Sequence, residues 1–171
     1  MVDFGSPPTN TRERLIQTAM DLFYHRGFHA VGLDCILNEV GVTNTTFYNH
    51  FESKDDLITE VISRRDDWEL ETWNRAVEAW AGDCPRAQLL AMFDVLHQWF
   101  NAPEFQGCIF INAAAEFPSP HDPAHQAAAR HKQRVLEKIL HRAAAAGLAD
   151  PQRFARQYVM ILEGAIVVRQ V

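Results

Sequence analysis

Hydroxyl and amide side chains are concentrated in one short segment of the chain. Thr43–His50, with the sequence TNTTFYNH, contains three Thr, two Asn, one Tyr and one His. If the segment is helical, Phe47 and Phe51 lie four residues apart on one face and can be buried together. The hydroxyl and amide groups then point elsewhere, and such groups suit phosphate oxygens and base edges. The segment therefore predicts a surface for nucleic-acid contact.

The residues before this segment predict how it is positioned. Leu33–Val40 has the apolar spacing of a short helix, and Gly41 can adopt the left-handed conformation that ends a helix cheaply. Thr43 is a good N-cap for the next helix, because its hydroxyl can accept a hydrogen bond from a free backbone N–H. Ser53 then begins a third helix. Helix, glycine-containing turn, helix is the helix-turn-helix arrangement, in which the second helix lies in the major groove.

The stretch Gly41–Leu57, GVTNTTFYNHFESKDDL, resembles the signature of the tetracycline-repressor (TetR) family of bacterial transcription factors. Residues 14–28 also resemble that family's first helix, so the similarity covers about residues 11–60. It implies that Asn44, Thr45, Tyr48 and Asn49 approach bases, and that Thr43, Thr46, His50 and Lys54 hold phosphates.

The whole chain is predicted to be all-α, with a three-helix head at residues 9–52 and a larger helical body at residues 53–171. Capping patterns predict helices from residue 11 to about 26 and from 53 to 81. Pro at the first helical position predicts further helix starts at residues 85, 123 and 151. We expect another helix at residues 106–116. The resemblance also implies that relatives continue beyond Val171.

Aromatic and polar residues of the body predict a pocket between helices, where bundles commonly bind small molecules. The alternative is a packed core without a cavity. The resemblance implies that an effector in the body releases the heads from DNA. The candidate lining residues are Trp73, Met92, Leu96, His97, Phe100, Phe110, Asn112 and Phe117.

The last two helices are long and rich in Ala, and small residues allow close helix approach. The resemblance implies that they pair with their copies, giving a homodimer and a palindromic operator. The alternative is an intramolecular hairpin. The candidate interface residues are Val135, Ile139, Tyr158, Ile161, Leu162 and Ile166.

Other functional classes find little support. No nucleophile stands with a base in a recognisable arrangement, so an enzyme is not expected, and we predict no cofactor. Glu116, His121, His125 and His131 are close in sequence, and His121 and His125 lie four apart. Because Pro123 starts a helix between these two His, they need not share a face, and a metal site is not expected. The chain has three Cys and no secretory signal, which predicts the reducing cytoplasm. A thiol redox sensor at Cys35 or Cys108 remains an alternative.

The charge of the predicted head is unusual for a DNA-binding unit. Residues 1–62 hold four Lys and Arg against nine Asp and Glu, a formal charge of −5. A basic footprint is the usual expectation for DNA binding. A ligand-binding protein with weakened DNA affinity is therefore a second alternative. If the head does bind DNA, affinity should fall only gently with salt. The interpretation we favour is a ligand-responsive repressor.

Overall fold

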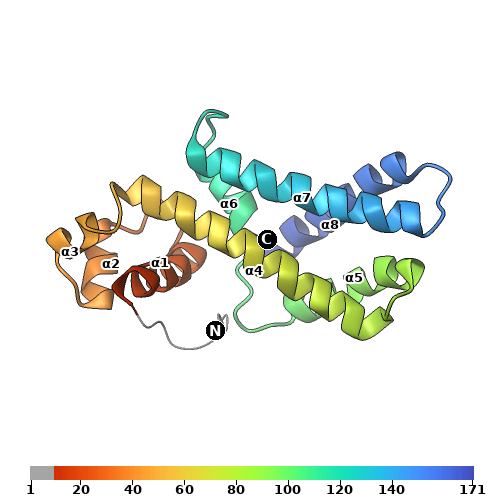
Figure 1. Cartoon of the computed structure of the whole chain (residues 1–171), viewed down its shortest axis with the longest axis horizontal. Helices are drawn as coiled ribbons and strands as arrows, with labels where there is room; N and C mark the ends of the chain where they lie inside the picture. Colours follow the sequence, from red (N-terminus) through yellow and green to blue (C-terminus); the bar gives the residue numbers. More distant parts are fainter. Residues whose placement is uncertain (1–9) are drawn as a thin grey trace. The chain divides into compact units, whose positions relative to one another are not determined.

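The computed structural model describes residues 10–171, and this part of the chain contains helices and no strands. Figure 1 shows the helices in chain order. They are α1 (Thr11–Arg26), α2 (Leu33–Val40), α3 (Asn44–Tyr48), α4 (Lys54–Ala81), α5 (Pro85–Phe100), α6 (Ile109–Glu116), α7 (Pro123–Ala145) and α8 (Pro151–Gln170). The prediction of an all-α fold is therefore confirmed. None of the helices described is long and apolar enough to cross a membrane.

The helix ends follow the signals in the sequence. The side chain of Asn10 caps α1 by accepting a hydrogen bond from the Glu13 N–H at 2.8 Å. At the start of α4, the Asp56 N–H donates to Ser53 Oγ, and the Glu52 N–H donates to the Asp56 carboxylate. Asp150 caps α8, with Pro151 in its first turn. Because these capping bonds are local, the predicted helix starts at residues 11, 85, 123 and 151 agree with the structure.

Two predicted helices are longer than the observed ones. The second helix of the helix-turn-helix was expected to reach Phe51, but α3 ends at Tyr48. The helix expected to begin at residue 106 begins at Ile109. In the first case the chain continues as a turn, in which the N–H groups of His50 and Phe51 both donate to the Phe47 carbonyl. The turn keeps Phe51 over the core although the helix has ended.

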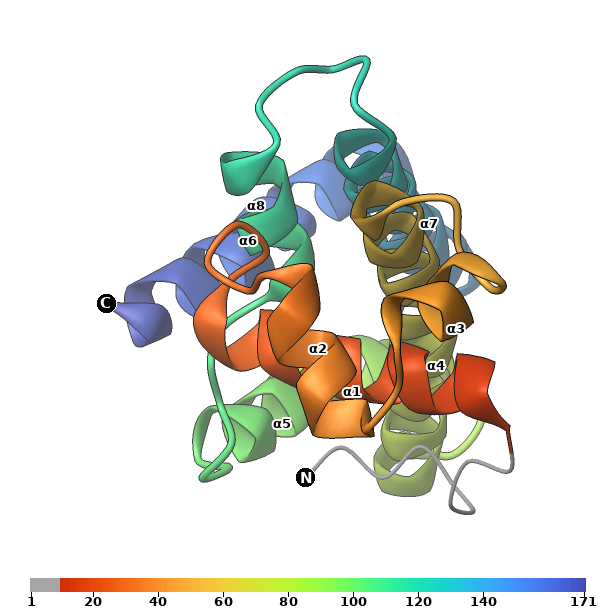
Figure 2. The same cartoon turned by 90° about the vertical axis from the view of Figure 1, so that its left-hand side faces the viewer.

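The chain divides into two compact units, and α4 and α7 each contribute residues to both. The described part of unit 1 comprises residues 10–66 and Ile109–Ala129. Figure 2 shows its helices α1, α2 and α3 together with α6. Its core is formed by large side chains that are almost completely buried: Leu15, Ile16, Phe23, Phe28, Ile36, Phe47, Leu57, Ile58, Ile109 and Phe110.

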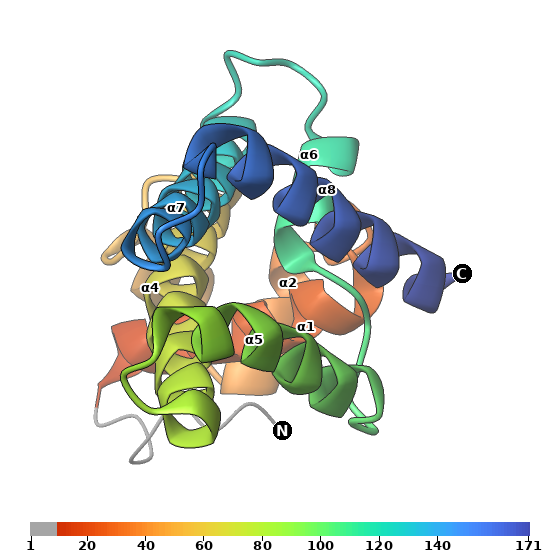
Figure 3. The same cartoon turned by 90° about the vertical axis from the view of Figure 1, so that its right-hand side faces the viewer.

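Unit 2 comprises Asp67–Cys108 and Arg130–Val171. Figure 3 shows its helices α5 and α8, with the second part of α7. Helices α5 and α8 are in contact, and the Tyr158 hydroxyl on α8 donates a hydrogen bond to the Leu89 carbonyl on α5. Burial raises the pKa of Tyr158, so this hydroxyl keeps its proton. The bond ties the two helices together inside the core.

Candidate nucleic-acid interface and effector cavity

The turn between α2 and α3 has the predicted geometry. Gly41 has a φ of 75° in the left-handed region, and its N–H donates to the Leu37 carbonyl at 2.8 Å. Thr43 then caps α3, because its Oγ1 accepts a hydrogen bond from the Thr46 N–H at 3.2 Å. The predicted roles of Gly41 and Thr43 in shaping the turn are confirmed.

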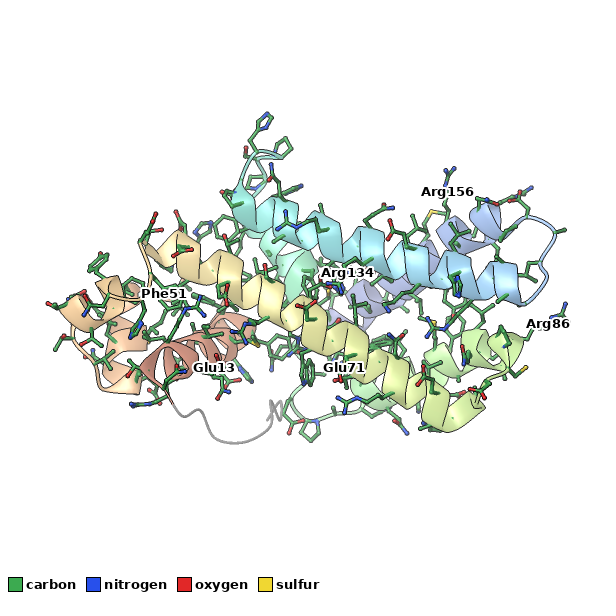
Figure 4. All side chains as sticks on the ribbon, in the orientation of Figure 1. Glu13, Phe51, Glu71, Arg86, Arg134 and Arg156 are labelled. Carbon is green, nitrogen blue, oxygen red and sulfur yellow. The ribbon has the colours of Figure 1, made fainter. Side chains whose placement is uncertain are left out.

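Two phenylalanines hold α3 against unit 1. Phe47 is 0% exposed and Phe51 is 2% exposed, and their rings stack with centroids 5.6 Å apart. Figure 4 shows Phe51 among the side chains of the head. Because both anchors lie on one face, the remaining side chains of this short helix are left outside the core.

The residues predicted to contact DNA are mostly at the surface. Tyr48 is 58% exposed, which is high for a large aromatic side chain. Thr46 and Lys54 are half-buried. The exposed members of the predicted set are Thr43, Asn44, Thr45, Tyr48, Asn49 and His50. This surface offers hydroxyl, amide and imidazole groups for hydrogen bonds to bases and phosphates, and little apolar area besides the ring of Tyr48.

The cations of the head are already engaged within the protein. Within the described residues 10–62, each Lys or Arg donates to a protein group: Arg12 to Glu60, Arg14 to the Val40 carbonyl, Arg26 to Cys35 Sγ and Lys54 to the Phe28 carbonyl. These contacts stabilise the head, and the exposed neutral groups of α3 add donors and acceptors for a nucleic acid beside them. Lys54 as a phosphate ligand stays a prediction, and its ammonium retains donors beyond the one used at 2.7 Å.

An acidic residue distant in sequence fastens the loop between α1 and α2. Glu116, at the end of α6, accepts hydrogen bonds from the Phe28 N–H at 3.0 Å and the His29 N–H at 2.7 Å. The His29 ring also contacts the Glu116 carbonyl at 2.8 Å. A Cβ on Gly27 would lie 3.0 Å from Glu116 Oε1, so glycine leaves room for the carboxylate.

Lys54 completes this arrangement, which we call the Glu116 latch: Glu116, Phe28, His29 and Lys54. Its amino group holds the Phe28 carbonyl, while burial lowers the pKa of Lys54 against the opposing effects of Asp55 and Glu116. The sequence reasoning missed the role of Glu116 because it lies 87 residues from His29 and no periodic pattern links them.

Unit 2 contains a partly open cavity of about 60 Å³. Apolar side chains from α4, α5, α7 and α8 form most of its wall, including Trp73, Met92, Leu96, Trp99 and Leu162. Charged groups also reach it. Lys132 Nζ lies 2.7 Å from Glu163 Oε2 and 3.3 Å from Cys108 Sγ. The alternative of a packed core without any cavity therefore does not describe unit 2.

The eight predicted pocket residues do not form one cluster. Trp73, Met92 and Leu96 line the cavity. His97 is exposed, and Phe100 packs against Phe105 with ring centroids 5.4 Å apart. The other three, Phe110, Asn112 and Phe117, lie in residues 109–129 and belong to unit 1. The sequence pattern missed this because α6 reads as part of the body, whereas residues 109–129 group with unit 1. There the ring of Phe117, directly after α6, contacts the ring of Phe28 in the loop between α1 and α2.

Comparisons with known proteins agree with this geometry. Residues 15–61 match the family described as bacterial regulatory proteins, tetR family. Residues 85–171, half of the chain, match the tetracyclin repressor-like C-terminal domain. The chain belongs to the TetR family.

Known TetR-family structures are similar to this protein over nearly its whole length. A TetR-family transcriptional regulator from Streptomyces coelicolor is 35% identical, with a TM-score of 0.82 over 93% of this chain and 83% of that one. A putative TetR regulator from Streptomyces avermitilis is 28% identical, with a TM-score of 0.85 over 95% and 87% of the two chains. The curated HTH-type transcriptional regulator YjdC of Escherichia coli is 22% identical over 91% of this chain and 81% of that protein. This TetR-family protein is accordingly a DNA-binding transcriptional regulator.

The residues predicted to pair two copies of this TetR-family protein lie mostly inside one copy. Four of the six are buried within unit 2, namely Ile139, Tyr158, Leu162 and Ile166, and Val135 lines the cavity. Those side chains are part of the core of unit 2, and their role in pairing two copies stays a prediction. Ile161 is 59% exposed and lies on the opposite face of α8, with Met160, Val167 and Val168.

The thiols and histidines of this TetR-family protein have ordinary partners. None of the three cysteines, all within the described residues, forms a disulfide; Cys84 is exposed, Cys35 half-buried and Cys108 buried. The His125 ring contacts the Phe117 carbonyl at 2.8 Å, and His131 Nε2 lies 3.8 Å from Glu69. Within residues 10–171 no group of three potential ligands is arranged to hold a metal ion.

Proposed function

We propose that this protein is a repressor that binds a palindromic operator as a homodimer and is released from it by a small-molecule effector. The observation that carries the DNA-binding part is the face of α3. Phe47 anchors the helix, while Tyr48, at 58% exposure, and the side chains of Asn44, Thr45 and Asn49 are exposed toward base edges and phosphates.

The exposed face of α8 supports the homodimer. Met160, Ile161, Val167 and Val168 are between 43% and 74% exposed on this helix, and Gly164 among them has nothing within 4 Å of an added Cβ. A second copy of the same helix can approach such a face closely and bury its apolar side chains. Two copies related by two-fold symmetry would present two α3 helices to successive turns of a palindrome.

Fluorescence anisotropy on DNA from upstream of the protein's own gene tests DNA binding. Tyr48→Ala is expected to raise the operator Kd by about tenfold or more, because a good base-edge contact contributes about 1–3 kcal/mol. Leu90→Ala is the matched control, since Leu90 is also a large exposed side chain, at 70%, but lies on α5. Full affinity in Tyr48→Ala would count against α3 as the reading helix. If the unaltered protein binds no operator, the alternative of a ligand-binding protein with weakened DNA affinity takes its place.

Sedimentation tests the dimer independently of DNA. Ile161→Glu is expected to give monomers, because it places a charge on the exposed apolar face of α8. Leu90→Glu adds the same charge to an exposed position of α5 and is expected to remain dimeric. A monomer mass for the unaltered protein would refute the proposed assembly. Repression itself is tested with a promoter reporter, whose expression should fall when the protein is supplied.

A further inference from the structure

Arg142 on α7 is a partly buried cation whose partners are both neutral. Its Nη2 donates to Asn74 Oδ1 at 2.8 Å, and its Nε donates to Gln88 Oε1 at 3.2 Å. Among the described residues, no carboxylate lies within 4 Å of it. Burial lowers the pKa of Arg142, against the opposing effects of Glu78 and Tyr158. Buried charges are ordinarily paired, and this half-buried guanidinium has no ion pair within 4 Å among residues 10–171, so it can take an anion as a further partner.

The other charges of the cavity do not supply that partner. The wall of the cavity carries the carboxylates of Glu69 and Glu163. Glu163 forms an ion pair with Lys132 at 2.7 Å, and Glu69 faces His131 at 3.8 Å. Both carboxylates therefore already have basic neighbours. Lys138 also lines the cavity and, like Arg142, has no ion pair within 4 Å in the described part of the chain.

The position of Arg142 gives a ligand both an apolar site and an approach. Arg142, Asn74 and Lys138 line this cavity and also a second, larger hollow of about 550 Å³ in the same unit. The apolar wall of the cavity includes Trp73, Met92, Leu96 and Trp99. A water molecule needs about 10–15 Å³ of such volume, so a cavity of 60 Å³ has space for roughly four or five waters. The short apolar part of a small ligand therefore fits without rearrangement of the side chains.

We propose that Arg142 is the anchor for the carboxylate of a small apolar monocarboxylic acid, which is the effector class of this protein. The guanidinium has five N–H donors and uses two on the amides of Asn74 and Gln88, so donors remain for a carboxylate. Asn74 and Gln88 hold the guanidinium in place, which lowers the cost of orienting it for a bidentate contact. Lys138 adds positive charge at the same end. That this acid acts as the effector rests on the proposed function. That it binds at Arg142 does not depend on the proposed function.

The test uses acids and amides of the same shape. Pentanoate and benzoate are titrated into the full-length protein without DNA by calorimetry and thermal shift, with pentanamide and benzamide as neutral counterparts. The carboxylates are expected to bind about tenfold or more tightly than the amides, because charge-assisted bonds to Arg are the stronger ones. Equal binding of acid and amide, or no binding of either acid, overturns the proposal.

Two variants locate the binding. Arg142→Gln is expected to remove the preference for the acid, and Arg142→Lys, which keeps the charge but not the planar fork, to retain part of it. Arg156→Gln is the control, because Arg156 is an exposed arginine of unit 2 that Figure 4 shows pointing away from α8. Unchanged acid preference in a folded Arg142→Gln protein overturns the assignment. If Arg142→Gln does not fold, the comparison of acids with amides on the unaltered protein still tests whether the cavity prefers a carboxylate.

Release from DNA is measured separately by adding the same acids to the operator complex. Acids that bind through Arg142 and raise the operator Kd support both proposals. Acids that bind but leave the operator Kd unchanged keep the carboxylate site and refute its role as the effector site.

Discussion

The carboxylate of Glu116 accepts a hydrogen bond from the backbone N–H of His29 at 2.7 Å, across 87 residues of sequence. The neighbouring Phe28 N–H donates to the other oxygen of the same carboxylate at 3.0 Å. Two consecutive N–H groups that converge on one anion form a rigid contact, because the carboxylate fixes the backbone of both residues. The loop that leads into the helix-turn-helix is thus held by the end of α6.

Glu116→Gln should loosen this loop. The amide keeps one acceptor oxygen but turns an NH₂ group toward the other N–H donor, so one backbone N–H loses its partner. We expect the free energy of unfolding to fall by about 2 kcal/mol and the operator Kd to rise, since α2 and α3 follow this loop directly. Urea unfolding and anisotropy measure the two effects.

Glu39→Gln is the control for the Glu116 latch. Glu39 is exposed on α2, so this substitution removes the same charge from the head without removing a bond to the loop. If Glu39→Gln and Glu116→Gln lower stability and operator affinity equally, the latch contributes nothing beyond its charge.

Local chemistry explains what the sequence could predict. The left-handed Gly41, the Thr43 cap and the Ser53 cap each depend on residues within four positions of one another, and each agrees with the structure. The Glu116 latch and the grouping of α6 with unit 1 depend on contacts between distant segments. Capping and periodicity carry no information about such contacts, which is why the predicted pocket set mixes residues of both units.

The helix face of α8 shows a second limit. Tyr158, Leu162 and Ile166 form an apolar stripe that is buried against unit 2, while Ile161 and Val168 form another that is exposed. A helix that is apolar on two faces has no preferred face in its sequence pattern. The sequence pattern of α8 therefore does not tell which apolar face packs within its own chain and which remains exposed.

Salt should weaken operator binding only gently. The Lys and Arg side chains of residues 10–62 are engaged within the head, so few of them can replace counterions on DNA. We expect the logarithm of the association constant to fall with the logarithm of salt at a slope shallower than about −4, corresponding to about four neutralised phosphates. Anisotropy at a series of salt concentrations measures it.

Asn44→Lys calibrates that slope. Asn44 is exposed at the start of α3, and one added cation there should steepen the slope by about 1 for each protomer. A slope near −10 in the unaltered protein would mean that its cations leave their internal partners when DNA binds.

The ion pairs of Glu60 should make stability depend on pH. Burial alone would raise the pKa of Glu60, but hydrogen bonds from Arg12 and Arg64 outweigh it and hold the pKa below the usual 4.5. A depressed pKa in the folded state means that the carboxylate stabilises the fold above pH 4.5, and that this contribution is lost as the pH falls through the lower folded value.

Glu60→Gln should therefore reduce the free energy of unfolding at neutral pH, and its difference from the unaltered protein should shrink as the pH is lowered below 4.5. Urea unfolding at several pH values measures this. Glu71→Gln on the same helix is the control, because Glu71 is 72% exposed and its nearest cation, Arg75, lies 3.9 Å away. A difference for Glu60→Gln that stays constant down to acid pH would show that the ion pairs do not hold the carboxylate in its charged form.

The three thiols should differ in reactivity according to access. Cys84 is exposed, whereas Cys108 is 3% exposed although Lys132 Nζ lies 3.3 Å from its sulfur. A nearby ammonium favours the reactive thiolate, but a reagent must first reach the sulfur, so burial governs the rate. Mass spectrometry after brief exposure to iodoacetamide should find Cys84 modified. Cys108 should be modified at least about tenfold more slowly than Cys84. Cys84→Ser should then react slowly overall.

Mild peroxide should modify the thiols in the same order. Modification of Cys108 ahead of Cys84 would instead favour the thiol-sensor alternative, with Lys132 as the activating group.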